Sequence, residues 1–563
     1  MIILGLGFLS DASACILRDG ELLAAVSEER LNRIKLWHGV PHASIECVLA
    51  QTGLSLQDVD LVATHGATDG AFAEIPFDDK AKLISDSSLS AERKTFQLKA
   101  LQSRRDHERM VVSVRTPDYL AEVAKLGRPV RVYSHHQAHA ACAFYGSGWE
   151  DALVLTADGW GEDASSTLWL GHGSELTRLS YSHTFDSLGY FYGGITKALG
   201  FIPHRHEGKV LGLAAFCADP KSYSAIADMV DVLPEEGRFL GRMENGLYLP
   251  RYDNPALAEF VMDFSREDVA AAAQRRLEEV VCALVAKQGD RARRLALAGG
   301  IFANVKLNQR LAELDNVEEV YVFPNMGDGG LSVGSAWLAH AEIYGVAPRP
   351  ATSMYLGPSI DNREALACLE QSGFPFTRPA NIAETVGNLL ADGHVVIRCT
   401  GAMEFGPRAL GHRSILYRAS DASVNDWLNR RLHRSEFMPF APATLASDAP
   451  SCYRNLDAGR SPARFMAMTF DCTQKMREQA PAAVHVDGTA RPQLVSEADY
   501  PDFFAILTAY HAKTGLSSLV NTSFNMHEEP IVCSAQDALR AFSASGLPFM
   551  ALGDFLVEGP DVA

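Results

Sequence analysis

Residues 152–170 read ALVLTADGWGEDASSTLWL, an apolar run that leads to Asp158-Gly159, then a polar turn and a second apolar run. The same order occurs near the amino terminus, where apolar segments at 2–6, 14–17 and 22–26 surround Asp11 and Asp19-Gly20. Asp-Gly between apolar runs is a strong short-range signal for a β-hairpin. This weak repeat of strand, aspartate, turn and strand predicts two related half-domains, each with a loop that aims an aspartate into a cleft between them.

The segments around these hairpins predict an α/β fold. Helical patterns cover 42–52, 78–125, 135–145, 254–288 and 331–341, and buried strands cover 295–298 and 320–323. The first of these strands ends in Gly299-Gly300 and the second in PNMGDGG at 324–330. A strand that ends in a glycine turn before a helix is where α/β folds bind ligands. The charged stretch at 104–109 predicts a solvated helix face rather than a site.

Length and composition exclude several classes of protein. The chain has 563 residues with 51 Lys plus Arg and 69 Asp plus Glu, for a net charge of −18. Single cores stop growing near about 250–300 residues, so two or more domains are expected. The proline-rich stretch at 345–358 predicts a boundary between domains at 1–348 and 354–563. The acidic balance argues against nonspecific binding to nucleic acid or to an anionic membrane.

The cysteines and the hydropathy pattern predict a cytoplasmic protein. Ten cysteines are spread singly and never as CxxC, which is typical of reduced buried thiols. The first twenty residues have no basic region of the kind that precedes a signal sequence, and no run of about 18 apolar residues occurs.

A histidine motif is the first candidate for chemistry. His135 and His139 are four residues apart on a predicted helix and therefore share one face. Asp158 and Asp328, at the ends of two strands, are plausible carboxylate ligands, and two His with two Asp suit Fe(II), Mn(II) or Zn(II). Two alternatives stay open: the histidines line or cap the helix, or His136 replaces His135 as a ligand, since 136 and 139 also share a face.

A loop rich in glycine and arginine at 401–416 is the second candidate. Its glycines and Pro407 force a turn, and Arg408 and Arg413 supply forked donors that match phosphate or carboxylate oxygens, with Arg398 just upstream. The alternative is a structural turn with surface arginines. Two further segments, 485–491 and 521–525, are dense in donors to phosphate or ribose but are also typical of Asx and Ser/Thr turns. No GxSxG signature occurs, which favours positioning, phosphate binding and a metal over a covalent enzyme intermediate.

Ten motifs in order resemble the NodU/CmcH carbamoyltransferases, which include O-carbamoyltransferases of antibiotic and nodulation-factor biosynthesis. The motifs are SEERLNRIK (27–35), HHQAHA (135–140), TADGWGE (156–162), HEGKVLGLAAF (206–216), AGGIFANVKLN (298–308), NMGDGG (325–330), MEFGPRALGHRSIL (403–416), EFMPFAPA (436–443), HVDGTARPQ (485–493) and NTSFN (521–525). The resemblance implies an N-terminal domain like the TsaD/Kae-type actin-like ATPases and a C-terminal YrdC-like domain. It also implies that carbamoyl phosphate and ATP give carbamoyladenylate, whose carbamoyl group passes to the hydroxyl of a small secondary metabolite.

The resemblance assigns roles to particular residues. It implies an iron ion, or another divalent ion, held by His135, His139, Asp158 and Asp328, with Mg²⁺ as a possible companion of ATP. Contacts to carbamoyladenylate are implied for Lys35, Gly299, Gly300, Asn304 and Asn308. The carbamoyl phosphate and ATP set is implied to include Arg398, Arg408, Arg413, Ser414, Arg434, Arg491 and Asn521. A monomer or homodimer with no nucleic-acid or membrane partner is expected.

Two departures from the family pattern bear on the acceptor. Relatives usually carry a histidine beside the first aspartate, as the base that activates the acceptor hydroxyl, but here the loop reads Phe8-Leu9-Ser10-Asp11. Asp11, His38 or a metal-bound group would have to serve as the base, or the acceptor is an amine. Many relatives also have lysines where this chain has Leu432-His433-Arg434, and Arg434 preserves the charge. The alternatives are therefore N-carbamoyl or threonylcarbamoyl-type transfer, or a nucleotide-binding regulatory or scaffold protein that has lost the transfer step.

Overall fold

The computed structural model describes residues 1–8, 10–66, 77–432 and 437–559. The chain forms two compact units. Unit 1 comprises residues 1–8, 17–21 and 56–350, and unit 2 comprises 9–16, 22–55 and 351–563. Two short N-terminal segments thus group with the C-terminal half of the chain, although they are separated from it by about three hundred residues of sequence.

Two five-stranded sheets with the same strand order form the N-terminal half of the fold. The first has the order β3-β2-β1-β4-β5 and the second has the order β8-β7-β6-β11-β12. The strands of the first sheet are β1 Ile2–Gly7, β2 Ser13–Arg18, β3 Glu21–Ser27, β4 Leu61–His65 and β5 Val130–Tyr133. Those of the second are β6 Asp151–Gly161, β7 Ala164–His172, β8 Glu175–His183, β11 Arg294–Ala298 and β12 Glu319–Val322. This duplicated order is that of the actin-like ATPases and confirms the repeat predicted from the two hairpins.

The first hairpin turn forms as its sequence predicts. Asp19 and Gly20 connect β2 to β3 with φ angles of 50° and 82°. Positive φ at both central residues is the geometry of a type I′ turn, which matches the twist of the flanking strands.

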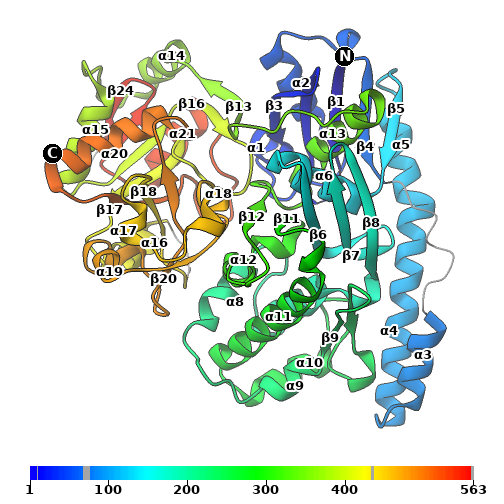
Figure 1. Cartoon of the computed structure of the whole chain (residues 1–563). Coiled ribbons are helices and arrows are strands. Elements are labelled where there is room, and N and C mark those ends of the chain that lie inside the picture. Colours follow the sequence, from blue (N-terminus) through cyan, green and yellow to red (C-terminus); the bar gives the residue numbers. More distant parts are fainter. Residues whose placement is uncertain (9, 67–76, 433–436, 560–563) are drawn as a thin grey trace. The chain divides into compact units, whose positions relative to one another are not determined.

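Two buried helices pack against each other and against the sheets. Helix α6 (His135–Ser147) contacts β6 and β11, and helix α13 (Leu331–Tyr344) contacts β1 and β4 (Figure 1). A Cβ atom at Gly334 would lie 2.0 Å from the carbonyl oxygen of Ala138, so the two helices approach each other too closely for any side chain there. The sulfur of Cys142 donates to the carbonyl of Gly330 at 2.9 Å across the same contact.

Gly334→Ala should therefore lower the free energy of unfolding by about 1–3 kcal/mol, because overpacked methyl groups in rigid interiors cost this much. Urea denaturation measures the change. Gly208→Ala is the matched control, since its Cβ would meet nothing within 4 Å and alanine favours the helix in which it lies. Equal stability of the two variants would show that α6 and α13 can move apart without cost.

The remaining helices of unit 1 surround these layers. They are α3 Phe77–Asp86, α4 Ala91–Met110, α5 Thr116–Ala124, α7 Leu188–Ala198, α8 Glu207–Ala214, α9 Tyr223–Ala227, α10 Pro255–Phe260, α11 Arg266–Gln288 and α12 Val305–Ala312. A two-stranded ribbon, β9 Val230–Leu233 with β10 Arg238–Gly241, packs against α11 and β8. The long helix α4 is conspicuous in Figure 1.

Unit 2 contains an eight-stranded mixed sheet of order β14-β24-β23-β15-β17-β22-β18-β21. Its strands are β14 Phe376–Thr377, β15 Val396–Cys399, β17 Arg413–Arg418, β18 Ala441–Leu445, β21 Gln493–Val495, β22 Ser518–Ser523, β23 Phe549–Leu552 and β24 Phe555–Glu558. Two further pairs are β13 Tyr355–Ile360 with β16 Gly401–Glu404, and β19 Phe470–Asp471 with β20 Thr489–Ala490. Its helices are α1 Glu28–Asn32, α2 His42–Thr52, α14 Asn362–Ser372, α15 Ile382–Ala391, α16 Val424–Arg431, α17 Ala449–Cys452, α18 Arg460–Ala463, α19 Gln474–Gln479, α20 Pro501–Thr514 and α21 Ala535–Ser545. The mixed α/β class predicted for the C-terminal half is confirmed; the YrdC likeness stays a prediction.

Helix α1 and the residue that follows it tie into the C-terminal segments of unit 2. Arg30 donates to the carbonyl of Gly406 at 2.8 Å. Arg33 donates to the carbonyls of Pro530 and Ile531, each at 2.7 Å. These contacts explain why the segment 22–55 groups with residues 351–563.

Among the described helices, none combines the length and the apolar character needed to cross a bilayer.

Candidate functional site

A β-bulge in β6 presents Asp158. The pairing of β6 with β7 is regular up to Ala157 opposite Ser166 and resumes only at Gly161 opposite Ala164. The sequence predicts a turn just after Asp158-Gly159, but the strand continues to Gly161 and the turn lies at 162–163. Bulges re-aim side chains next to active sites, and here the residues 158–160 leave the regular ladder. Asp158 is thus fixed by a deformation of the strand rather than by a flexible turn.

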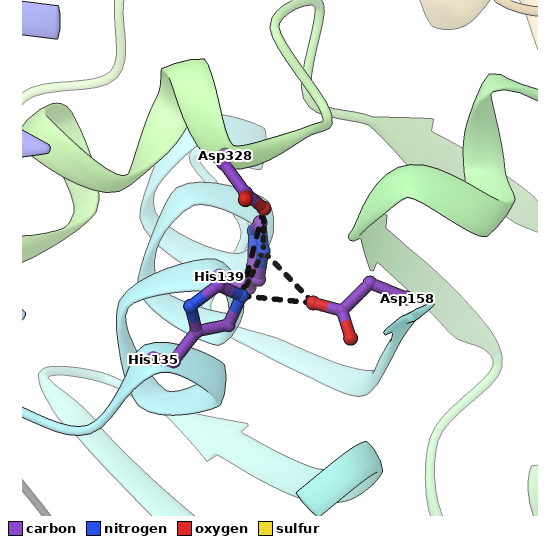
Figure 2. A group of neighbouring side chains, drawn as sticks. All are labelled: His135, His139, Asp158 and Asp328. Atoms are coloured by element: carbon purple, nitrogen blue, oxygen red, sulfur yellow. Dashed lines mark hydrogen bonds and ion pairs between the residues drawn. The ribbon is translucent and has the colours of Figure 1, made fainter. Parts of the chain in front are cut away.

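His135 and His139 face Asp158 and Asp328 from helix α6 (Figure 2). The Nε2 atom of His135 lies 2.8 Å from Oδ2 of Asp158 and 3.6 Å from Oδ1 of Asp328. The Nε2 atom of His139 lies 3.4 Å and 3.6 Å from the same two oxygens. The two Nε2 atoms are 3.1 Å apart. The four residues predicted as one cluster therefore lie together, with their ligand atoms converging on one point.

The local sequence fixes this arrangement. Ser134 caps α6 by accepting a hydrogen bond from the backbone N–H of Gln137 at 3.3 Å, so the helix begins at His135. Both histidines are fully buried, and a Cβ at Gly161 would lie 2.5 Å from the His135 ring. The chain can pass this close to the ring only because residue 161 is glycine.

The charges in the cluster are strongly coupled. Burial opposes charge on His135, but the Asp158 carboxylate outweighs it and raises the pKa of His135 to about 9. Burial alone would raise the pKa of Asp158, whereas the neighbouring His136 and His135 rings, when protonated, hold it well below its usual range. Without an ion the cluster thus retains a proton between the rings and the carboxylates.

The residues present fit a divalent cation. Two imidazole nitrogens this close repel unless a proton or a cation lies between them, and two carboxylate oxygens complete the donor set. Two His and two Asp are ligands for borderline to hard divalent ions. In the described part of the chain, the Nδ1 atoms of His135 and His139 are buried without a hydrogen-bond partner, so no protein contact fixes which nitrogen carries the proton.

His136 is occupied elsewhere. Its Nδ1 lies 2.7 Å from Oγ1 of Thr156 and its Nε2 lies 3.0 Å from the carbonyl oxygen of Ala164. Burial lowers the pKa of His136 to about 4, so the ring is neutral and both nitrogens serve the contact between α6 and the second sheet. This geometry favours His135 over His136 as the partner of His139.

The glycine turn after β11 combines a packing role with open space. Gly299 has φ 103°, and its Cβ would lie 2.3 Å from the carbonyl oxygen of Ala157, so only glycine fits. A Cβ at Gly300 would meet nothing within 4 Å, which leaves the backbone accessible to a ligand. Asn304 caps α12 and exchanges two hydrogen bonds with Gln274, at 2.8 and 3.1 Å. Asn308 is fully buried and donates to the carbonyl of Phe302 at 2.8 Å.

In unit 2, a buried carboxylate organises the glycine and arginine loop. Oε1 of Glu404 accepts hydrogen bonds from the backbone N–H groups of Leu410 and His412 at 2.8 Å and of Arg413 at 3.2 Å. Gln493 donates to the carbonyl of Leu410 at 2.7 Å. Three N–H groups on one oxygen define a nest, so the loop conformation is set by a residue inside the motif.

Arg413 and Arg398 are committed to the same loop. Arg413 is fully buried and donates to the carbonyl oxygens of Pro358, Thr400, Gly401, His412 and Cys533. Arg398 is buried, donates to the carbonyl of Gly411 at 2.8 Å, and lies 3.7 Å from Asp502. Burial lowers the pKa of Arg398. In this structure both guanidinium groups hold the backbone of the predicted anion loop.

The other predicted residues of unit 2 border this loop. Asn521 donates to the carbonyl of Ala409 at 3.2 Å and to Oε1 of Gln493 at 2.8 Å. Ser414 accepts from the N–H of Gly411 at 3.0 Å. Arg408 and Arg491 are partly exposed, and Arg491 lies 3.5 Å from the carbonyl of Met466. Partly exposed arginines above a rigid turn are suited to bind an anion.

Three predicted residues lie elsewhere. Asp11, with φ 61°, and Lys35 belong to the segments that group with unit 2. Arg434 lies outside the described residues.

A second prediction from the sequence is also wrong. The charged stretch 104–109 is not a fully solvated helix face, because Arg104 and Glu108 of α4 are buried. Their burial cannot be predicted from the local sequence, because charged residues surround them and an aromatic partner of Arg104, Trp160, is distant in the sequence. Glu404 is a functional residue that the sequence reasoning missed, although it lies inside the motif at 403–416. Its position just before the glycines of the loop could have indicated that it organises the turn.

The comparisons with known proteins identify the family. Residues 2–337 match the family described as Carbamoyltransferase N-terminus, and residues 387–559 match Carbamoyltransferase C-terminus. The chain is 32% identical to Nodulation protein NolNO of Sinorhizobium fredii strain NGR234 over 98% of this chain and 79% of that protein. It is 26% identical to Nodulation protein U of Rhizobium tropici over 94% and 91%. The chain therefore belongs to the carbamoyltransferase family, and its enzyme class is that of a carbamoyltransferase.

Distant likenesses to solved structures are also found. HypF of T. kodakarensis is 13% identical with a TM-score of 0.35, over 61% of this chain and 48% of that one. Component A of the (R)-2-hydroxyglutaryl-CoA dehydratase of Acidaminococcus fermentans is 14% identical with a TM-score of 0.36, over 61% and 98%.

Proposed function

We propose that the protein makes carbamoyladenylate from carbamoyl phosphate and ATP and transfers the carbamoyl group to a hydroxyl of a small molecule. Water cleaves carbamoyl phosphate to carbamate and phosphate, carbamate displaces pyrophosphate from ATP, and the acceptor hydroxyl then displaces AMP. Membership of the family supports carbamoyl transfer. The observation that carries the finer proposal is the rigid loop 404–413, whose Arg408 stands partly exposed on a backbone held by Glu404.

The residues of unit 2 have a consistent physical role in this proposal. Arg408 and Arg491 offset the charge that develops when phosphate or pyrophosphate leaves. Arg398 and Arg413 fix the loop and so keep these donors preorganised. Preorganised donors lower the reaction barrier more than donors on a mobile loop would. A fixed loop also limits access of water to carbamate, which is short-lived in water.

The residues of unit 1 fit the transfer step. His135, His139, Asp158 and Asp328 would hold Fe(II) or another divalent ion, which when bound supplies a Lewis acid that polarises a carbonyl or phosphoryl oxygen. The open backbone at Gly300 allows close approach of the nucleotide, and ATP in unit 2 would carry Mg²⁺.

The test is release of pyrophosphate by the purified protein with ATP and Fe(II), with and without carbamoyl phosphate, and with no acceptor present. Pyrophosphate is expected only when carbamoyl phosphate is present. Arg408→Ala is expected to reduce the release by about 100-fold or more, as loss of one transition-state donor does in other sites. Arg363→Ala, an exposed arginine on α14, is the matched control and should leave the rate unchanged.

Absence of carbamoyl phosphate-dependent pyrophosphate from the wild-type protein would contradict the adenylation step. The hypothesis of a nucleotide-binding regulatory or scaffold protein would then be favoured.

A further inference from the structure

A buried ion pair on α4 lies outside the site described above. The Nε atom of Arg104 donates to Oε1 of Glu108 at 2.7 Å, one helical turn away. The Nη1 atom of Arg104 donates to the hydroxyl of Tyr190 at 2.6 Å. Thr184 also donates to Oε1 of Glu108. The Arg104 side chain is 7% exposed and that of Glu108 is fully buried.

This pair is only half formed. In a forked arginine–carboxylate pair, the second hydrogen bond joins Nη2 to the second carboxylate oxygen. Here Nη2 of Arg104 and Oε2 of Glu108 both lack a partner among the residues that the structure describes. Nη2 belongs to the same guanidinium as Nε, and Oε2 belongs to the same carboxylate as Oε1, the two atoms that do form a hydrogen bond. An unpaired donor and an unpaired acceptor therefore lie close to each other. Buried polar atoms without partners are costly, which points to a ligand that completes them.

The pair lies beside the candidate metal centre. The guanidinium of Arg104 stacks on the ring of Trp160 at 4.6 Å and on that of Tyr190 at 4.8 Å. Trp160 follows Asp158 by two residues, within the bulge of β6. The hydroxyl of Ser187 donates to the carbonyls of Asp158 and Gly159 at 3.2 and 2.6 Å, and it also caps α7 by accepting from the N–H of Tyr190 at 3.0 Å.

Aromatic rings extend the surface next to the pair. Trp160 is partly exposed, and the His107 ring meets its edge at 5.6 Å. The Tyr252 ring lies 4.9 Å from that of Tyr190. Rings of this kind offer apolar faces with polar edges, a combination that binds ring-shaped molecules bearing polar groups.

We propose that Arg104 and Glu108, with Trp160 stacked on Arg104, bind the carbamoyl acceptor through one of its hydroxyl groups, and that the acceptor is an uncharged molecule with an apolar ring face. The proposal rests on the proposed function, because it names the acceptor class of that reaction. A hydroxyl can donate to Oε2 of Glu108 and accept from Nη2 of Arg104 at the same time.

The alternatives to a hydroxyl satisfy only one half of the site. An ammonium group has no acceptor for Arg104, and a carboxylate or phosphate has no donor for Glu108. The pair is also neutral as a whole, so a charged ligand would lose its hydration without gaining a counter-charge. Arg104 and Glu108 are therefore specificity-determining residues.

The change of tryptophan fluorescence during titration with three ring compounds tests this proposal: cyclohexanol, cyclohexylamine and cyclohexanecarboxylate. They share one apolar ring and differ in the charge of one group. Cyclohexanol should bind at least about tenfold more tightly than the other two. Trp160→Phe should remove most of the fluorescence change, since the ring of Trp160 stacks on Arg104.

Substitutions in the pair provide the second arm. Arg104→Lys and Glu108→Gln should each weaken cyclohexanol binding by about tenfold. The double variant Arg104→Met with Glu108→Gln removes both charges and the Arg104 donor and leaves no unpaired buried charge, so it keeps the test valid if a single variant fails to fold. Asp106→Asn, on the exposed side of α4, is the matched control and should bind as the wild type does.

Equal or tighter binding of either charged ring, unchanged binding in the double variant, or no binding of cyclohexanol to the wild type would overturn the proposal. The fluorescence change requires no turnover. Failure of pyrophosphate release would therefore overturn the proposed function and leave the binding result intact.

Discussion

Asp158→Asn should abolish binding of a divalent ion to unit 1 and reduce carbamoyl transfer by more than about 100-fold, because even the outer partners of metal ligands are worth about 10–100-fold. The carboxylate is the nearest anion to both histidines, at 2.8 and 3.4 Å. Asparagine keeps the shape of the side chain but removes the charge that offsets a cation. The bulge of β6 is unaffected, so the protein should remain folded.

Ion content gives a readout independent of activity. The wild-type protein, loaded with Fe(II) and desalted, should retain about one equivalent, whereas Asp158→Asn should retain almost none. Asp151→Asn, at the exposed start of the same strand, is the matched control. If Asp158→Asn retains the ion as the wild type does, the cluster is a proton-sharing structural group and the transfer chemistry needs another origin.

The second large effect is expected from Arg413→Met, which should lower the free energy of unfolding by about 3–5 kcal/mol. The substitution leaves buried carbonyl oxygens without donors, and each such loss costs about 1–3 kcal/mol before any relaxation. The adjacent residues Thr400 and Gly401 supply two of those carbonyls, and Cys533, distant in the sequence, supplies a third. Urea denaturation followed by circular dichroism measures the change.

Arg408→Met separates the two kinds of arginine in this loop. Because Arg408 is partly exposed, the variant should lose less than about 0.5 kcal/mol of stability, as is usual for surface positions, while it still loses pyrophosphate release. A stable Arg413→Met protein with a specific loss of carbamoyl phosphate affinity would show that Arg413 leaves its carbonyl partners to bind substrate.

Local patterns account for the part of the fold that the sequence predicts. Asp19-Gly20 forms a tight turn because both residues tolerate positive φ, and no distant contact is needed. The helix predicted at 135–145 forms from His135 to Ser147. Its spacing of four places both imidazoles on one face, and Asp158 in the bulge of β6 and Asp328 in the turn after β12 complete the cluster. The helix and its spacing follow short-range rules, whereas tertiary packing brings the helix and the two aspartates together.

The rest depends on partners far apart in sequence. Arg413 looks like an anion-binding residue in its glycine-rich context, but the carbonyls that it contacts come from segments as distant as Pro358 and Cys533. Arg104 looks solvated because charged residues flank it, and its burial arises from Trp160 and Tyr190. A pattern of residue types shows which groups are available, and tertiary packing decides whether they serve the fold or a ligand.

The attachment of α1 to the C-terminal segments limits how such proteins can recombine. A hybrid of two relatives joined near residue 350 would pair the Arg30 and Arg33 of one parent with the carbonyl turns at 406 and 530–531 of the other. The part of the chain that must come from one parent is therefore discontinuous, because residues 22–55 and 351–563 belong to the same unit. Exchange of the C-terminal half alone would join surfaces that have not evolved together, so working hybrids should come from crossovers that carry both pieces.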